Sequence, residues 1–181
     1  MTIKKNNKNT LLFICLAASL SAFPLAGASA QDDSPVVTEG INHLGLAVKN
    51  LDKTVTFFTD TLGWRTAGGD PDYPAVFVTD GNAFVTLWQV TDPKTAIEFN
   101  RKNNVGLHHL AFTVKSLKAL HELHQKFQDV DGLVIEFAPE FMGQGPTTHM
   151  MIREPSGNRL EFVVPGSRVR AEMEAKQQTE K

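Results

Sequence analysis

The chain has 181 residues, of which 41% are hydrophobic and 21% are charged, and its formal net charge is −2. This composition supplies enough apolar material for a folded core, so disorder is not the expected state. The small net charge and the lack of a Lys/Arg stripe predict no nucleic-acid partner and no anionic membrane surface. The length predicts one domain plus an extension.

The first thirty residues have the three parts of an export signal. A lysine-containing stretch (residues 4–8) precedes an apolar run (residues 11–20) that is too short to span a bilayer comfortably. Residues 28–30 read Ala-Ser-Ala, which is typical of a cleavage site. We therefore predict a signal peptide over residues 1–30 and a periplasmic or secreted protein without membrane attachment after cleavage. An N-terminal membrane anchor is the alternative.

The single cysteine, Cys15, lies inside this signal segment. The mature chain would therefore contain no thiol, which excludes disulfides, thiol catalysis and cysteine metal ligands. Residues 31–39 are polar and predict a linker. Residues 167–181 predict a polar tail with some helix around residues 171–176.

An internal repeat organises the chain between linker and tail. Residues 43–51 and 109–117 share His, Leu, Val, Lys and Leu at the same offsets, 66 residues apart. In both copies, large apolar residues alternate with a histidine and then small residues, which predicts a strand with one open face. A repeat of this length indicates one supersecondary module copied once.

Each copy continues with one helix and three strands. Asn50 and Ser116 are candidate N-caps for helices over 51–62 and 117–127. Turn residues and apolar runs predict further strands near 64–67, 75–79 and 83–90, then near 134–138, 149–154 and 158–164. The sequence thus predicts a domain over residues 40–166, with βαβββ module one at 40–92 and module two at 105–166.

Two motifs complete the likeness to a known family. Residues 154–162 read Glu-Pro-Ser-Gly-Asn-Arg-Leu-Glu-Phe, and residues 57–64 read Phe-Phe-Thr-Asp-Thr-Leu-Gly-Trp. With the paired modules, they resemble the vicinal-oxygen-chelate superfamily, which includes glyoxalase I, extradiol dioxygenases and bleomycin-resistance proteins. The resemblance implies an α+β fold in which two paired βαβββ modules form a cupped mixed sheet. It also implies a homodimer.

The resemblance implies metal ligands on the first and last strand of each module. His43 matches the first ligand, His109 the third and Glu161 the fourth. His108 is predicted to point to the opposite face of its strand. The second position departs from the family pattern, because an alignment with a one-residue gap places Thr86 there and an ungapped one places Val85.

Threonine is a poor metal ligand, and polar Gln89 lies three residues beyond Thr86. We therefore predict three protein ligands. Two imidazoles and one carboxylate leave about three open positions in an octahedral shell. One divalent metal ion is expected, with Fe(II) or Mn(II) favoured and Zn(II), Ni(II) or Co(II) compatible. Such a metal would act as a Lewis acid on a small substrate bound through two adjacent oxygens.

Further residues are candidates for the same cup. His149 shares strand parity with Met151 and Arg153, so it is a candidate general acid or base. The alternative is a histidine bonded only to backbone or water. The expected pocket residues are Phe77, Phe84, Trp88, Met151 and Arg153. Each aromatic residue has core packing as its alternative.

Two functions remain open at this level. One is a metal-dependent glyoxalase- or dioxygenase-like enzyme. The other is a metal-free module that sequesters a ligand, as bleomycin-resistance proteins do. A structural ion pair between Glu161 and Arg159 would favour the metal-free reading. The sequence names neither substrate nor reaction, and it leaves open whether the site lies within one chain or across a dimer.

Overall fold

A computed structural model describes residues 37–179, and its compact unit begins at Gly40. The predicted signal peptide and residues 31–36 of the linker lie outside the described residues. Within the described part, none of the helices combines the length and apolar character needed to cross a bilayer.

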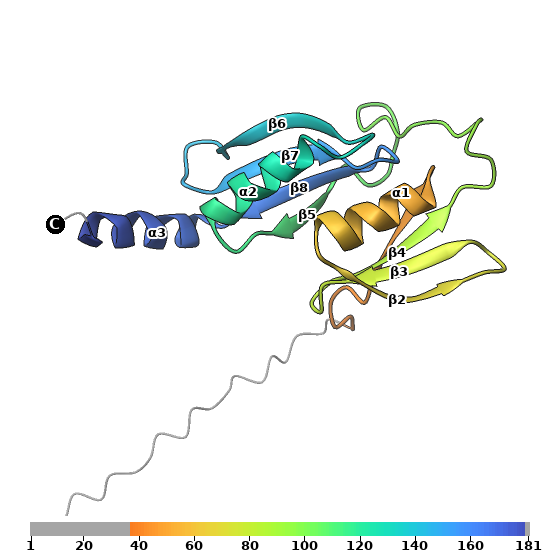
Figure 1. Cartoon of the computed structure of the whole chain (residues 1–181), viewed down its shortest axis with the longest axis horizontal. Coiled ribbons are helices and arrows are strands. Elements are labelled where there is room, and N and C mark those ends of the chain that lie inside the picture. The colour runs from red at the N-terminus through yellow and green to blue at the C-terminus, as the bar shows by residue number, and fades with distance from the viewer. Residues whose placement is uncertain (1–36, 180–181) are drawn as a thin grey trace, which may run out of the picture. The chain divides into compact units, whose positions relative to one another are not determined.

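The first module is a four-stranded sheet, called sheet A, with a helix on one face (Figure 1). Its strand order is β1-β4-β3-β2; β1 runs parallel to β4, and the other pairs are antiparallel. Its elements are β1 (Leu44–Val48), α1 (Leu51–Thr56), the π-helical turn η1 (Phe57–Thr61), β2 (Arg65–Asp70), β3 (Ala75–Thr79) and β4 (Phe84–Gln89).

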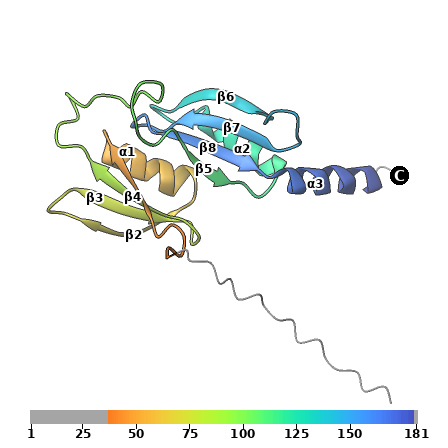
Figure 2. The same cartoon turned by 180° about the vertical axis from the view of Figure 1, so that it is seen from behind.

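The second module repeats this arrangement as sheet B, with strand order β5-β8-β7-β6. Figure 2 shows the same two sheets from behind, with α1 against sheet A and α2 against sheet B. Its elements are β5 (Leu110–Thr113), α2 (Leu117–Phe127), β6 (Val134–Phe141), β7 (Thr148–Arg153) and β8 (Arg159–Val164). The predicted α+β class and the two βαβββ modules are confirmed.

Local sequence explains where the two helices begin. The Asn50 side chain accepts a hydrogen bond from the Lys53 amide at 3.0 Å, and the Ser116 hydroxyl accepts one from the Ala119 amide at 3.0 Å. These caps satisfy amides that the first helical turn leaves unpaired. The first helix widens into a π turn at Phe57 and Phe58, and both phenyl rings are fully buried there.

The helix-facing sides of both sheets share one apolar core. Met150 and Ile152 of β7 belong to it, as the alternation in this strand predicts. Phe112 of β5 packs against Trp64 of module one, with ring centroids 5.2 Å apart. The opposite side of each sheet, called its free face, lies outside this core.

A buried carboxylate joins the modules where the β7–β8 turn meets α1. Glu154 is fully buried and accepts hydrogen bonds from the Thr54 hydroxyl (2.7 Å) and the Ser156 amide (2.9 Å). Its other oxygen accepts from the backbone (3.0 Å) and side-chain (2.9 Å) nitrogens of Asn158. Asn158 also donates to the Ala47 carbonyl at 3.0 Å. The acidic residue of the Pro-Ser-Gly-Asn motif thus has a structural function.

The polar end of the chain is more ordered than the sequence predicts. Helix α3 spans Gly166–Thr179, whereas some helix was expected only around residues 171–176. Val169 is fully buried, and the Glu172 carboxylate accepts a hydrogen bond from the Leu117 amide at 3.1 Å. One apolar contact and one cap of α2 therefore anchor the first turns of this helix.

We predict that Glu154→Ala lowers the free energy of unfolding by about 3 kcal/mol or more, because it leaves several buried donors without an acceptor. Urea denaturation would measure the change. The control is Glu122→Ala on α2, whose exposed ion pair with Lys118 spans 3.6 Å and should contribute less than about 0.5 kcal/mol. Equal, small losses in both variants would contradict a structural role for Glu154.

Candidate functional site

Strand register decides which residues occupy equivalent places in the two modules. Gly45 of β1 lies beside Thr86 of β4, and Ala111 of β5 lies beside Glu161 of β8. Since Gly45 and Ala111 are equivalent in the repeat, Thr86 occupies the place in module one that Glu161 occupies in module two. Of the two alignments that the sequence left open, the structure therefore supports the one with a gap.

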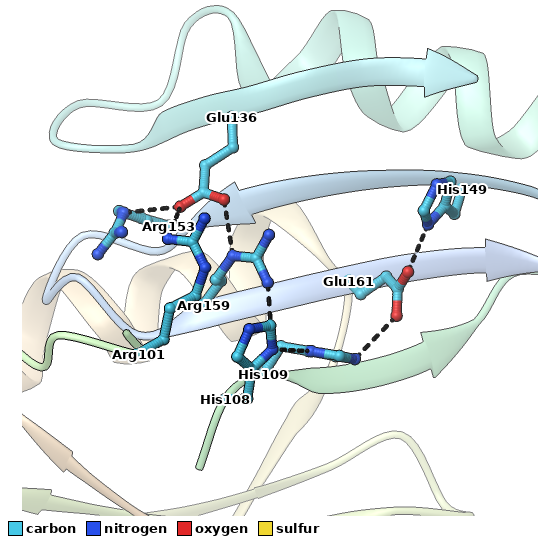
Figure 3. Close-up of polar contacts among 8 residues, drawn as sticks. All are labelled: Arg101, His108, His109, Glu136, His149, Arg153, Arg159 and Glu161. Carbon is cyan, nitrogen blue, oxygen red and sulfur yellow. Dashed lines mark hydrogen bonds and ion pairs between the residues drawn. The ribbon is translucent and has the colours of Figure 1, made fainter. Parts of the chain in front are cut away.

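Glu161 lies between two histidines on the free face of sheet B. Its Oε2 atom is 3.1 Å from Nε2 of His109, and its Oε1 atom contacts Nδ1 of His149. Glu161 is only 6% exposed, so the imidazoles provide the polar partners that a buried carboxylate needs. Figure 3 shows the three side chains converging from the start of β5, from β7 and from β8.

His43 is exposed and does not join this group. Its Nδ1 atom bonds to the Asn42 side chain at 2.8 Å, and its ring packs edge-on against Phe84 at 6.4 Å. Among the described residues of one chain, no cluster of three His, Cys, Asp or Glu side chains has a metal-binding arrangement. The structure thus brings together His109 and Glu161, two of the three predicted ligands.

The two second-position candidates are engaged elsewhere. The Thr86 hydroxyl accepts a hydrogen bond from Nε1 of Trp88 at 2.9 Å and donates to the Leu44 carbonyl at 3.4 Å. The Gln89 amide accepts from the Leu51 amide and donates to the Lys49 carbonyl, both at 2.9 Å. Gln89 therefore joins the end of β1 to the start of α1.

The predicted pocket residues fall into two groups. Phe77, Phe84 and Trp88 form an aromatic patch on the free face of sheet A, with centroid distances of 6.1 Å and 5.8 Å from Phe77 to the other two rings. Met151 is buried beside Glu161 in the β7–β8 register, and Arg153 follows on the same face. In a single chain, these groups line different sheets.

A cluster of three arginines around Glu136 was not predicted from the sequence. The Glu136 carboxylate accepts a hydrogen bond from Nε of Arg159 (2.6 Å), and its other oxygen forms an ion pair with Nε of Arg153 (2.9 Å). Nη1 of Arg101 is 3.9 Å away (Figure 3). The alternation of strand residues would have placed Arg153 and Arg159 on the same face. Nothing in the sequence between β4 and β5 indicates that Arg101 joins them. Arg159 pairs with Glu136 and not with Glu161, so the suggested Arg159–Glu161 ion pair is wrong.

His108 connects this arginine cluster to the Glu161 group. Its Nδ1 atom is 2.8 Å from Nδ1 of His109 and 3.4 Å from Nη1 of Arg159. The expectation that His108 faces away is therefore wrong, because both histidines precede β5 and are not bound by strand alternation. Desolvation and the charge of Arg159 lower the pKa of the His108 imidazole.

The arginines around Glu136 also affect how the stability of the fold depends on pH. Burial alone would raise the pKa of Glu136, but the hydrogen bond from Arg159 and the surrounding arginine charges outweigh it and hold the pKa below its ordinary value of 4.5. A lowered carboxyl pKa stabilises the fold above the unfolded-state pKa, and this contribution is lost as pH falls through the folded-state pKa.

We therefore expect the difference in unfolding free energy between wild type and Glu136→Gln to be constant above about pH 5.5 and to shrink toward pH 3. Denaturant titrations at several pH values would measure it. A difference that stayed constant down to pH 3 would contradict the shifted pKa.

Comparisons with known proteins agree with this fold. Residues 40–162 match the Glyoxalase/Bleomycin resistance protein/Dioxygenase superfamily. An uncharacterized protein, YwkD of Bacillus subtilis, is 30% identical over 99 residues, which cover 50% of this chain and 74% of YwkD.

Two solved structures extend the likeness to the three-dimensional fold. A glyoxylase/bleomycin resistance protein/dioxygenase domain from Frankia has a TM-score of 0.60 at 22% identity, covering 70% of this chain and 98% of that one. The fosfomycin resistance protein FosX of Listeria monocytogenes has a TM-score of 0.57 at 16% identity, covering 75% and 98%. The chain belongs to the glyoxalase/bleomycin resistance protein/dioxygenase superfamily.

Proposed function

We propose that this protein is a metal-dependent enzyme that acts on a small substrate held through two vicinal oxygens. The observation that carries the proposal is the buried carboxylate of Glu161, which meets His109 on one side and His149 on the other. A carboxylate in this position needs positive charge or strong donors nearby. A divalent cation shared by Glu161 and His109 would supply that charge.

The donor set fits a divalent metal ion. Metal–nitrogen and metal–oxygen bonds near 2.1 Å place neighbouring ligand atoms roughly 3 Å apart. Oε2 of Glu161 and Nε2 of His109 are separated by 3.1 Å. Nitrogen and carboxylate ligands favour Fe(II) or Mn(II), while Zn(II), Ni(II) and Co(II) are compatible.

For the third ligand we propose His43 of a second copy of the chain. His43 lies just before β1, which is an edge strand of sheet A, and β5 is likewise an edge strand of sheet B. Each of these edges pairs with one strand only, which leaves its other side free for contact with a second chain. In such a dimer, the free face of one sheet A and the free face of the other sheet B would form the cup.

The bound metal would supply Lewis acidity toward substrate oxygens. We assign His149 to proton transfer, because its Nδ1 atom bonds to Glu161 and no hydrogen bond among the described residues engages its Nε2 atom. The Phe137 ring, 4.9 Å from the imidazole, helps to hold it in place. The Nε2 atom would hold or accept the proton that the substrate exchanges.

A metal-free ligand-binding module is the second candidate. It is favoured by the second ligand position, where the Thr86 hydroxyl already has two hydrogen-bond partners. The aromatic patch on sheet A would then bind an apolar or cationic part of the ligand. In either case we propose that the chain is exported and acts as a homodimer on a small molecule.

We predict about one equivalent of divalent metal per chain in the mature protein, residues 31–181, and loss of this metal in Glu161→Ala and His109→Ala. Elemental analysis after aerobic and anaerobic purification would measure it. The matched controls are His121→Ala on α2 and Glu174→Ala on α3, which remove exposed side chains elsewhere and should keep the metal.

Two outcomes would count against the enzyme. Absence of metal from the wild type, with none taken up on reconstitution, would leave the ligand-binding module as the answer. Equal metal loss in His121→Ala would show that the metal binds non-specifically to surface imidazoles.

A further inference from the structure

A cavity of about 270 Å³ lies beside the arginine cluster. Its walls come from β1, from the segment 96–101 that follows module one, and from the turn 156–158 between β7 and β8. Arg101, Arg153 and Arg159 all line it. Its volume is close to the lower end of the range for small-molecule sites.

The positive charge at this cavity exceeds what the protein itself neutralises. Three guanidinium groups surround the one carboxylate of Glu136, so the cluster keeps two positive charges in excess. Lys49 and Glu98 at the rim pair with each other at 3.2 Å and do not change this balance. Like charges brought together in a partly buried place repel, and a bound anion would remove the repulsion.

The hydrogen-bonding pattern leaves suitable donors free. Glu136 engages Arg153 and Arg159 through their Nε atoms, and it lies too far from Arg101 for a hydrogen bond. Within residues 37–179, no hydrogen bond engages the Nη atoms of Arg101 or Arg153. Glu136 therefore orients the guanidinium groups, while the nitrogen pairs that bind carboxylate or phosphate groups remain free.

We propose that this cavity binds the carboxylate or phosphate-type group of a small anionic molecule through Arg101, Arg153 and Arg159. A structural salt bridge for Glu136 would need only one arginine, and the second and third are explained by an external anion. The segment that carries Arg101 also forms one side of the cavity.

The position of the cavity adds a constraint on the substrate, and this step rests on the proposed function. Arg159 and Glu161 are two residues apart on β8 and lie on the same face of sheet B (Figure 3). Two residues of a strand span roughly 6.6 Å. His108 lines the cavity and contacts His109, whereas Glu161 lies outside the lining. A molecule with its anionic group at the arginines would therefore reach Glu161 only by extending along β8 past His108. The substrate class is therefore a small carboxylate or phosphate-type anion that carries vicinal oxygens.

Calorimetric titration of the purified protein in chelator-containing buffer tests the anion site without metal. The probes are inorganic phosphate and malonate, and the tighter of the two identifies the type of anion. We expect one anion per chain, and about tenfold or greater weakening in Arg101→Gln and Arg153→Gln, since each removes a charge-assisted hydrogen bond. Arg170→Gln, an exposed arginine on α3, is the control and should bind normally.

Failure of both probes to bind at millimolar concentration would overturn the proposal. Equal weakening in Arg170→Gln would also overturn it, because it would show non-specific attraction to surface charge. Thermal melting of Arg101→Gln should match wild type, since among residues 37–179 this side chain makes no hydrogen bond and no ion pair other than the 3.9 Å one with Glu136. If the protein binds the anion but takes up no divalent metal on reconstitution without chelator, the proposed enzyme is contradicted and this anion site stands. If it takes up metal but binds neither anion, the anion site is contradicted and the proposed enzyme stands.

Discussion

The fully buried carboxylate of Glu154 is the constraint on which the site depends. It closes the β7–β8 turn, where its own amide donates to the Asn158 carbonyl at 2.9 Å, and it accepts a hydrogen bond from Thr54 of α1. A hairpin register that slipped by one residue would turn every side chain to the opposite face. By fixing this register, Glu154 keeps Arg159 and Glu161 on the free face of sheet B and the alternate residues in the core.

The same arrangement separates the candidate site residues of one chain into two groups. The helix-facing sides of both sheets share a single core, so the polar and aromatic groups occupy the opposite faces. Module two carries Glu161, its two histidine partners, Arg153 and Arg159, whereas module one contributes exposed His43 and aromatic rings. In the proposed dimer, the module-one surface of a second copy would face this group.

The sequence predicted most of the fold because the repeat and its alternation are strong local signals. Ser116 and Asn50 mark the helix starts, and the parity of β7 correctly places Met150 and Ile152 in the core. The site was predicted less completely. Glu161 and His109 meet, but the roles of His108 and Glu136 depend on contacts between segments far apart in the chain. Local periodicity carries no information about such contacts.

The central claim is that His43 of one copy completes the site formed by His109 and Glu161 of the other. The most direct test combines two variants that each lack one proposed ligand, His43→Ala and Glu161→Ala, by co-expression with different tags and isolation of the heterodimer. A site shared between chains predicts that one of the two sites in the heterodimer is intact, so about half of the wild-type metal returns. A site within one chain predicts no recovery, and a heterodimer without metal would contradict the account.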